Sequence, residues 1–195
     1  MNISFKAKIP ISECQIYDRE KKQFTNATLW EYDCKDYSDI KHFKMNFRRW
    51  TYMEGFISGM RNKYRDFCQG LLNKESEQDR FYSLELPNNY IVGFCETTDN
   101  NEKINIHYLE TQRDRRYKYA GQSILASLAK KMINSFNDPI MTIDHPANSA
   151  RNFYINKCGF QPYGEKALHM YKYNMSDFVK TFEERTQSPI IDYRC

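Results

Sequence analysis

Short runs of the chain alternate hydrophobic and polar residues, and a period of two predicts β-strands. The first 26 residues alternate weakly, which predicts an edge strand or hairpin with four residues on one face: Ile3, Phe5, Ala7 and Ile9. A second strand is expected at 27–33. Three β-rich runs at 81–86, 89–98 and 102–111 are separated by turn-forming residues, so they predict an antiparallel meander.

Other segments repeat their hydrophobic residues at steps of three and four, which is the spacing of an amphipathic helix. The first such segment runs from Ile40 to Leu71, and Gly55 and Gly59 interrupt it, so it predicts two helices or one bent helix. A second helix is expected at 121–136. A third is expected at 148–158, begun by Asn148 and ended by Gly159.

Short strands are expected after these helices, at 140–144, 160–164 and 167–173. The order of elements predicts the α/β class, with a single mixed sheet and helices on both faces. This domain would span 1–173. Residues 174–195 are expected to form a polar C-terminal extension that either packs back on the domain or extends into solvent.

Composition agrees with a folded domain, since 41% of the 195 residues are hydrophobic and 15% are aromatic. The net charge of +4 permits an anionic ligand, but nucleic acid is not expected as a partner. The absence of a long apolar run or signal-like N-terminus leads us to expect a cytoplasmic protein with no membrane partner. The six cysteines and four histidines lack the clustered spacing of a zinc site, so reduced thiols and no metal are expected.

A basic segment stands where the last strand of the meander gives way to a helix. It reads Arg116, Tyr117, Lys118, Tyr119, Ala120 and Gly121, followed by Gln122 and Ser123. The first N–H groups of a helix are unpaired and its dipole is positive at that end, which favours a bound anion. Gly121 would let the backbone approach that anion closely. The segment therefore indicates either a solvated helix cap or an anion-binding loop, in which Arg116, Lys118 and the Ser123 hydroxyl could assist.

A second motif, HPANSARNFYINKCGF, spans His145 to Phe160. Together with the basic loop and the element order, it resembles the GCN5-related N-acetyltransferase (GNAT) superfamily over about 27–173. The loop is similar to the family's acyl-CoA pyrophosphate motif, Q/R-x-x-G-x-G/A, and the second motif is similar to its N-x-x-A-x-x-F-Y-x-x-x-G-F element. Tyr119 stands where the family usually has its first glycine, and Asn148 to Ala150 is one residue shorter than the commonest spacing.

The resemblance implies a GNAT-like, mostly antiparallel sheet and an acetyl-CoA-dependent transfer to a primary amine by direct attack in a ternary complex. It implies that the Tyr154 hydroxyl protonates the leaving thiolate. The implied acetyl-CoA contacts come from the main chain of the last meander strand, the loop and the second motif: Leu109, Thr111, Arg116, Tyr117, Lys118, Tyr119, Ala120, Gly121, Gln122, Ser123, Asn148 and Phe153.

The base that accepts the amine proton is expected on the strand KINIHYLET, at 103–111. Simple alternation would place Asn105, His107, Leu109 and Thr111 on one face and Glu110 on the other. The family's carboxylate base aligns with about Asn105, which cannot act as a base. His107 is the candidate because imidazole titrates near neutral pH. A structural role for His107, Glu110 as the base, and no dedicated base at all stay open.

The acceptor pocket is expected beside the first predicted helices, in a region rich in aromatic residues where Glu54 could attract an amine: Phe43, Phe47, Trp50, Tyr52 and Phe56. The acceptor itself is left open, as is a homodimer, which the family forms in many cases through its C-terminal strands. One alternative is a non-catalytic acyl-CoA-binding regulatory protein of the same fold. Another is a nucleic-acid binder that uses Arg113, Arg115, Arg116 and Lys118.

Overall fold

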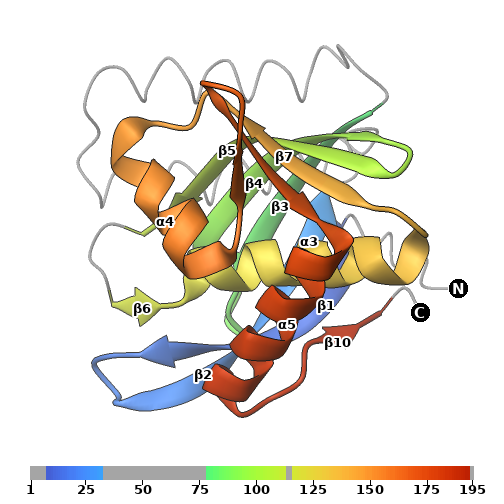
Figure 1. Cartoon of the computed structure of the whole chain (residues 1–195). Coiled ribbons are helices and arrows are strands. Elements are labelled where there is room, and N and C mark those ends of the chain that lie inside the picture. Colours follow the sequence, from blue (N-terminus) through green and yellow to red (C-terminus); the bar gives the residue numbers. More distant parts are fainter. Residues whose placement is uncertain (1–7, 33–77, 113–115, 194–195) are drawn as a thin grey trace, which may run out of the picture.

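The computed structural model describes residues 8–32, 78–112 and 116–193 (Figure 1). The strands are β1 (Lys8–Asp18), β2 (Gln23–Tyr32), β3 (Asp79–Glu85), β4 (Ile91–Asn100), β5 (Lys103–Thr111), β6 (Tyr117–Lys118), β7 (Ile140–Asp144), β8 (Gln161–Tyr163), β9 (Ala167–Tyr171) and β10 (Ile191–Asp192). The helices within these ranges are α3 (Ala120–Ser135), α4 (Asn148–Cys158) and α5 (Lys172–Thr186). The helical segment expected at Ile40–Leu71 and its aromatic acceptor region lie outside the described residues.

The strands form one sheet in the order β10-β1-β2-β3-β4-β5-β7-β9-β8, with β6 paired to β1. Every neighbouring pair is antiparallel except β5 and β7, which are parallel. The predicted meander is confirmed as β3-β4-β5, and its turns place Asn89 and Asn101 at positive φ, which asparagine tolerates well. The prediction of a single mixed, mostly antiparallel sheet is therefore confirmed.

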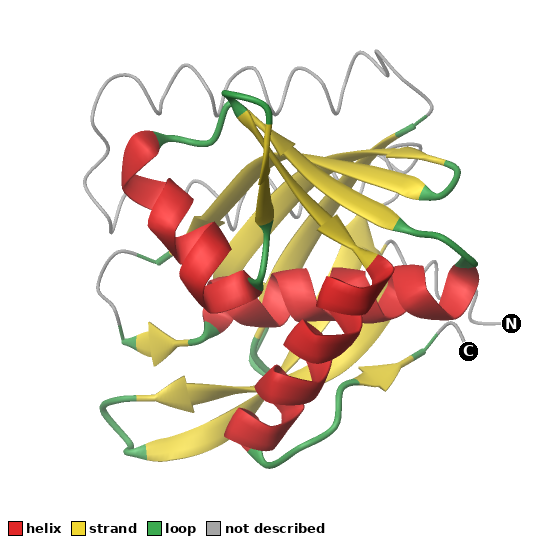
Figure 2. Cartoon of the chain, viewed as in Figure 1, coloured by secondary structure: helices red, strands yellow, loops and turns green. Residues whose placement is uncertain are grey.

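Helix α3 lies across one face of the sheet (Figure 2), and its buried residues form a large part of the core. Its apolar stripe at Ile124, Leu125, Leu128 and Met132 is at most 1% exposed and faces β1, β4 and β5. Ser123 and Ser127 are equally buried, so the helix is enclosed on more than its apolar side. The start of this helix is consequently held in one place relative to the sheet.

The C-terminal segment, expected as a polar extension, packs back on the domain. Helix α5 lies against α3 on the same face of the sheet (Figure 1) and buries Met175, Phe178, Val179 and Phe182, which recur at steps of three and four. Strand β10 then pairs with β1, so of the two alternatives expected for the first residues, β1 forms a hairpin with β2 and is not an edge strand. The many charged residues of α5 concealed this stripe, because they occupy its exposed side.

Phe182→Ala tests whether α5 is an integral part of the domain. Because Phe182 is 1% exposed within the core, the substitution is expected to lower the free energy of unfolding by about 3 to 5 kcal/mol in urea denaturation. Tyr173→Ala, on the same helix but 74% exposed, is the matched control and should stay within about 0.5 kcal/mol of wild type. Equal stabilities for the two variants would contradict the placement of α5.

Candidate functional site

Strands β5 and β7 separate soon after they begin. Their parallel pairing joins only Lys103–Asn105 to Ile140–Thr142, whereas β7 pairs with β9 and β5 pairs with β4 along the whole of their other edges. Among the described elements, no strand pairs with this edge of β5 beyond Asn105. Unpaired N–H and C=O groups along a strand edge are ready to bind another extended chain. The widening gap therefore offers a linear array of backbone donors and acceptors.

Asn105 holds the two strands together where they separate. Its side-chain oxygen accepts a hydrogen bond from Thr142 Oγ1 (2.9 Å), and its amide nitrogen donates to Asp144 Oδ2 (3.0 Å). Both partners lie on β7, so the asparagine bridges the strands through a side chain that neither ladder uses. Asn105, which aligns with the family's catalytic carboxylate, thus links β5 to β7 in this chain.

A β-bulge at His107 changes which residues of β5 share a face. Glu96 of β4 pairs with Tyr108 and Thr97 pairs with Ile106, which leaves His107 as the extra residue. Simple alternation was therefore wrong: Leu109 and Thr111 share the face of Ile106, whereas Asn105 and Tyr108 share the opposite face. The bulge turns Leu109 and Thr111 toward α3 and α4.

The loop before α3 ends in a residue of unusual conformation. Tyr119 has φ 76° and ψ −1°, the left-handed region that glycine normally occupies, and it is the N-cap of α3. Its carbonyl accepts hydrogen bonds from the Ser123 N–H (2.8 Å) and the Ser123 hydroxyl (3.0 Å). Tyrosine thus holds a backbone conformation that glycine adopts more readily, and Ser123, fully buried, is hydrogen-bonded within the loop.

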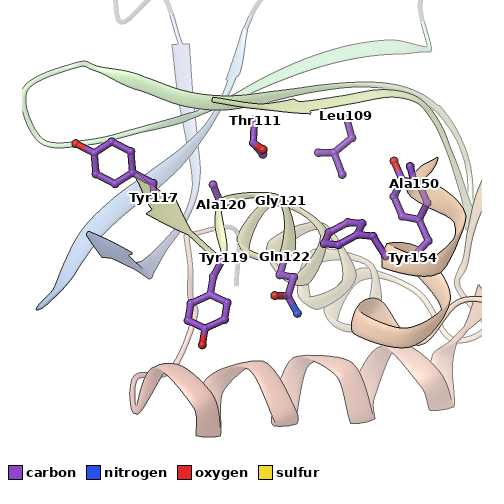
Figure 3. Close-up of a pocket in the computed structure, with 10 residues that line it drawn as sticks. Leu109, Thr111, Tyr117, Tyr119, Ala120, Gly121, Gln122, Ala150 and Tyr154 are labelled. Atoms are coloured by element: carbon purple, nitrogen blue, oxygen red, sulfur yellow. The ribbon is translucent and has the colours of Figure 1, made fainter. Parts of the chain in front are cut away.

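A cavity of about 280 Å³ lies between the open edge of β5 and the N-terminus of α3 (Figure 3). The bond from Ser123 to Tyr119 closes the first helical turn, so the preceding N–H groups of Ala120, Gly121 and Gln122 have no intrahelical acceptor. That turn contains no acidic residue. The cavity is lined by three elements and the loop between them: Leu109, Thr111, Tyr117, Tyr119, Ala120, Gly121, Gln122, Ala150, Phe153 and Tyr154.

Gly121 is the point of closest approach within this cavity. A Cβ atom added there would lie 3.4 Å from Phe153 Cζ and 3.5 Å from Thr111 Cγ2, which is ordinary contact for a methyl group but leaves no room for more. Gly121 has no positive φ, so backbone conformation does not require a glycine here, and the nearby side chains exclude only residues larger than alanine. A larger residue would fill the space next to the free helix amides.

Tyr154 lies at the α4 side of the cavity and is 8% exposed. Its ring makes edge contacts with Phe153 (5.3 Å between centroids) and Phe160 (5.8 Å). Burial, with smaller contributions from Cys95, Cys158 and Glu110, raises the pKa of its hydroxyl well above the ordinary value of about 10. The hydroxyl therefore stays protonated throughout the neutral range and keeps a proton to donate.

The structure brings together nine of the residues predicted to contact the ligand or the reacting atoms, and all nine line the cavity: Leu109, Thr111, Tyr117, Tyr119, Ala120, Gly121, Gln122, Phe153 and Tyr154. Gln122 also donates to the Lys157 carbonyl (2.9 Å) and so joins α3 to α4. Asn148 is exposed at the start of α4 and is not part of the lining. Ala150, in the motif at His145 to Phe160, also lines the cavity but was not among the predicted contact residues.

Arg116 is engaged elsewhere. Its guanidinium donates to Asp18 through Nε (3.3 Å) and Nη2 (3.0 Å), and Nη1 lies 2.7 Å from Glu20. The hydrogen bond from Arg116 holds the pKa of Asp18 below its usual range. Arg116 therefore anchors the loop to the β1–β2 hairpin, whereas the Lys118 Nζ lies over the Tyr119 ring at 4.6 Å.

Polar side chains gather beside the bulge on the face of β5 that points away from α3. Thr98 Oγ1 donates to Asp79 Oδ1 (2.8 Å) and lies 2.7 Å from His107 Nε2. Since a hydroxyl has one proton, His107 Nε2 is the donor to Thr98, and the lone pair of the neutral imidazole is on Nδ1. His107 is exposed rather than buried.

Glu96 is the residue of this group that the sequence analysis missed. It is partly buried on β4, directly opposite Tyr108. Burial, together with the like charge of Asp79, raises the pKa of Glu96 to about 7. A carboxylate within the apolar run IVGFCETT was the available signal, since acidic residues are rarely buried without a reason.

Within the described residues, no helix is both long and apolar enough to cross a bilayer. The same residues contain no group of three or more His, Cys, Asp and Glu side chains that could hold a metal ion.

Comparison with solved structures identifies the fold. A GNAT-family acetyltransferase from Staphylococcus aureus Mu50 matches with a TM-score of 0.51 and 15% sequence identity, covering 75% of this chain and 99% of that chain. The KacTA–DNA complex matches with a TM-score of 0.50 and 12% identity, covering 65% and 89% respectively. No protein-family model matches the sequence, and no curated protein matches it.

The chain therefore has the GNAT fold, and the resemblance stated from two sequence motifs is confirmed at the level of fold. Sequence identities of this size say nothing about substrates.

Proposed function

We propose that the protein is an acetyl-CoA-dependent N-acetyltransferase that transfers the acetyl group to a primary amine within a ternary complex. The observation that carries the proposal is the cavity itself, because it joins a helix N-terminus, a buried hydroxyl donor and a strand edge with which no other described strand pairs. Acetyl-CoA offers matching chemistry in the same linear order: a diphosphate, an extended arm with two amides, and a thioester.

Binding follows from the positions of these groups. The amides of Ala120, Gly121 and Gln122 would hold the diphosphate, where the helix dipole adds favourable potential. The pantetheine arm would extend along β5 and pair with the main chain near Leu109 and Thr111 as an additional strand does. This places the thioester near the bulge, with Tyr154 on the α4 side. No metal is needed for any of these contacts.

In the reaction, the amine nitrogen attacks the thioester carbonyl carbon, the carbon–sulfur bond breaks, and the sulfur departs with the bonding pair. Tyr154 donates a hydrogen bond to that sulfur and supplies its proton, which solvent later replaces. Because burial raises the pKa of Tyr154 far above that of a thiol, full proton transfer stays uphill even when the sulfur carries its whole negative charge. Stabilising that charge in the transition state is therefore the larger part of its contribution.

The proton released by the amine needs an acceptor beside the bulge. Glu96 and His107 both occupy that position, on the face opposite the core helices. His107 was the candidate from the sequence, and its Nδ1 lone pair is available. Glu96 is the stronger candidate, because its pKa of about 7 makes it both substantially ionised and basic near neutral pH.

The proposal is tested on the full chain by calorimetric titration with acetyl-CoA, followed by a thiol-release assay against a panel of primary amines. Binding together with amine-dependent release of CoA is expected. Binding with no turnover on any amine would instead favour a non-catalytic acyl-CoA-binding protein. Affinity for oligonucleotides that weakens with salt, with no affinity for acetyl-CoA, would favour the nucleic-acid alternative.

Tyr154→Phe is expected to lower kcat by at least about tenfold while the affinity for acetyl-CoA changes little, because the ring and its packing remain. The measurement is steady-state kinetics combined with calorimetry. Phe153→Leu, which alters the neighbouring ring without removing a hydroxyl, is the matched control and should affect binding more than kcat. An unchanged kcat in Tyr154→Phe would remove the hydroxyl from the mechanism.

Glu96→Gln and His107→Gln distinguish the two candidate bases. A base works only when deprotonated, so the wild-type kcat/KM should rise as the pH increases through about 7. Glu96→Gln should abolish this rise and reduce kcat/KM by about a hundredfold, whereas His107→Gln should keep it. The reverse pattern would assign the base to His107, and an unchanged profile in both variants would indicate that no dedicated base operates.

A further inference from the structure

The last turn of α5 reaches the loop at the start of α3. The Arg185 guanidinium carbon lies 5.8 Å from the centre of the Tyr119 ring, and Lys118 Nζ lies 4.6 Å from the same centre. Figure 3 shows the Tyr119 ring directed from the start of α3 toward α5. Two cations from distant parts of the chain thus share one aromatic ring beside the free helix amides.

Arg185 has no other evident role in the described part of the chain. Arg185 is exposed, and no ion pair joins it to a described acidic residue. Glu183, on the same helix, is paired with Lys130 instead (2.7 Å). Its charge also acts on Cys158 at the end of α4, opposing the effect of burial on the pKa of that thiol. Arg185 is therefore close to the ends of two helices that border the cavity.

The backbone conformation of Tyr119 is unfavourable for a residue of its size. A bulky residue at φ 76° is energetically unfavourable, and it persists only where the surroundings favour it. The contacts of its ring with Lys118 and Arg185 are such an influence. An arginine over an aromatic face keeps its N–H groups at the rim free for an anion, so the ring positions the cation without neutralising it.

We propose that Arg185 binds a phosphate group of CoA, with Tyr119 as the residue that positions it. The proposal rests on the proposed function and adds to it that the C-terminal helix supplies part of the cofactor site. Arg116, expected from the sequence to assist, is already bound to Asp18 and Glu20. The phosphate is either the diphosphate or the 3′-phosphate of CoA, which have the same charge chemistry.

The test is calorimetric titration of the full chain with CoA and with dephospho-CoA. Arg185→Gln is expected to raise the Kd for CoA about tenfold. Lys180→Gln, which removes an exposed positive charge from the same helix, is the matched control and should leave the Kd unchanged. If the loss persists with dephospho-CoA, Arg185 contacts the diphosphate; if it disappears, Arg185 contacts the 3′-phosphate. Equal Kd values for Arg185→Gln and wild type would overturn the proposal.

A double-mutant cycle tests the positioning role of Tyr119. Tyr119→Leu should weaken CoA binding, and Arg185→Gln should then have a smaller effect in the Tyr119→Leu background than in wild type. Arg185→Lys should recover part of the affinity. Full additivity of the two losses would refute the positioning role. Unfolding midpoints equal to wild type are required of each variant, and a wild-type chain that fails to bind CoA would refute the proposed function instead.

Discussion

The site depends on the short pairing of β5 with β7, which leaves the rest of this β5 edge without a described partner strand. Their parallel register lasts from Lys103 to Asn105 on β5, and Asn105 fastens the strands there through Thr142 and Asp144. Beyond this point no described strand lies between β5 and β7, although β5 stays paired with β4 and β7 with β9. An edge of backbone groups therefore opens within the sheet. Buried backbone groups need hydrogen-bond partners, and the proposed pantetheine arm carries amides that could supply them.

Much of this arrangement was accessible from sequence, because it is local. Helical spacing predicts α3 and its apolar stripe. The free N–H groups at a helix start predict that Gly121 lies where an anion could bind. The faces of β5 were not accessible. A bulge at His107 depends on how β4 and β5 pair, and no property of β5 alone reveals that an extra residue is inserted. The same bulge determines the sheet faces of Leu109 and Thr111. The prediction that they share a face with Asn105, which assumed strict alternation, was therefore wrong.

Two other differences have distinct physical causes. The role of Glu96 depends on burial and on Asp79 from a neighbouring strand, and both arise only after the strands pair. The packing of α5 was concealed because its charged residues dominate the composition, although the buried stripe has ordinary helical spacing. Arg116 illustrates a third case. Its charge suggested an anion, yet its nearest partners are carboxylates on the β1–β2 hairpin, which is far away in sequence.

The pairing of β10 with β1 has a consequence for how the protein is made. The Tyr193 N–H donates to the Ile11 carbonyl (2.9 Å), and Ser12 pairs with Asp192, so nearly the last described residues complete the sheet beside the first described strand. Helix α5, which covers α3, is also synthesised late. A nascent chain emerging from the ribosome therefore carries β1 without its partner at Ser12 and Glu13, and α3 without its cover, until residue 192 has left the exit tunnel. Folding of this domain is therefore completed only after its central strands have been synthesised, when β10 pairs with β1.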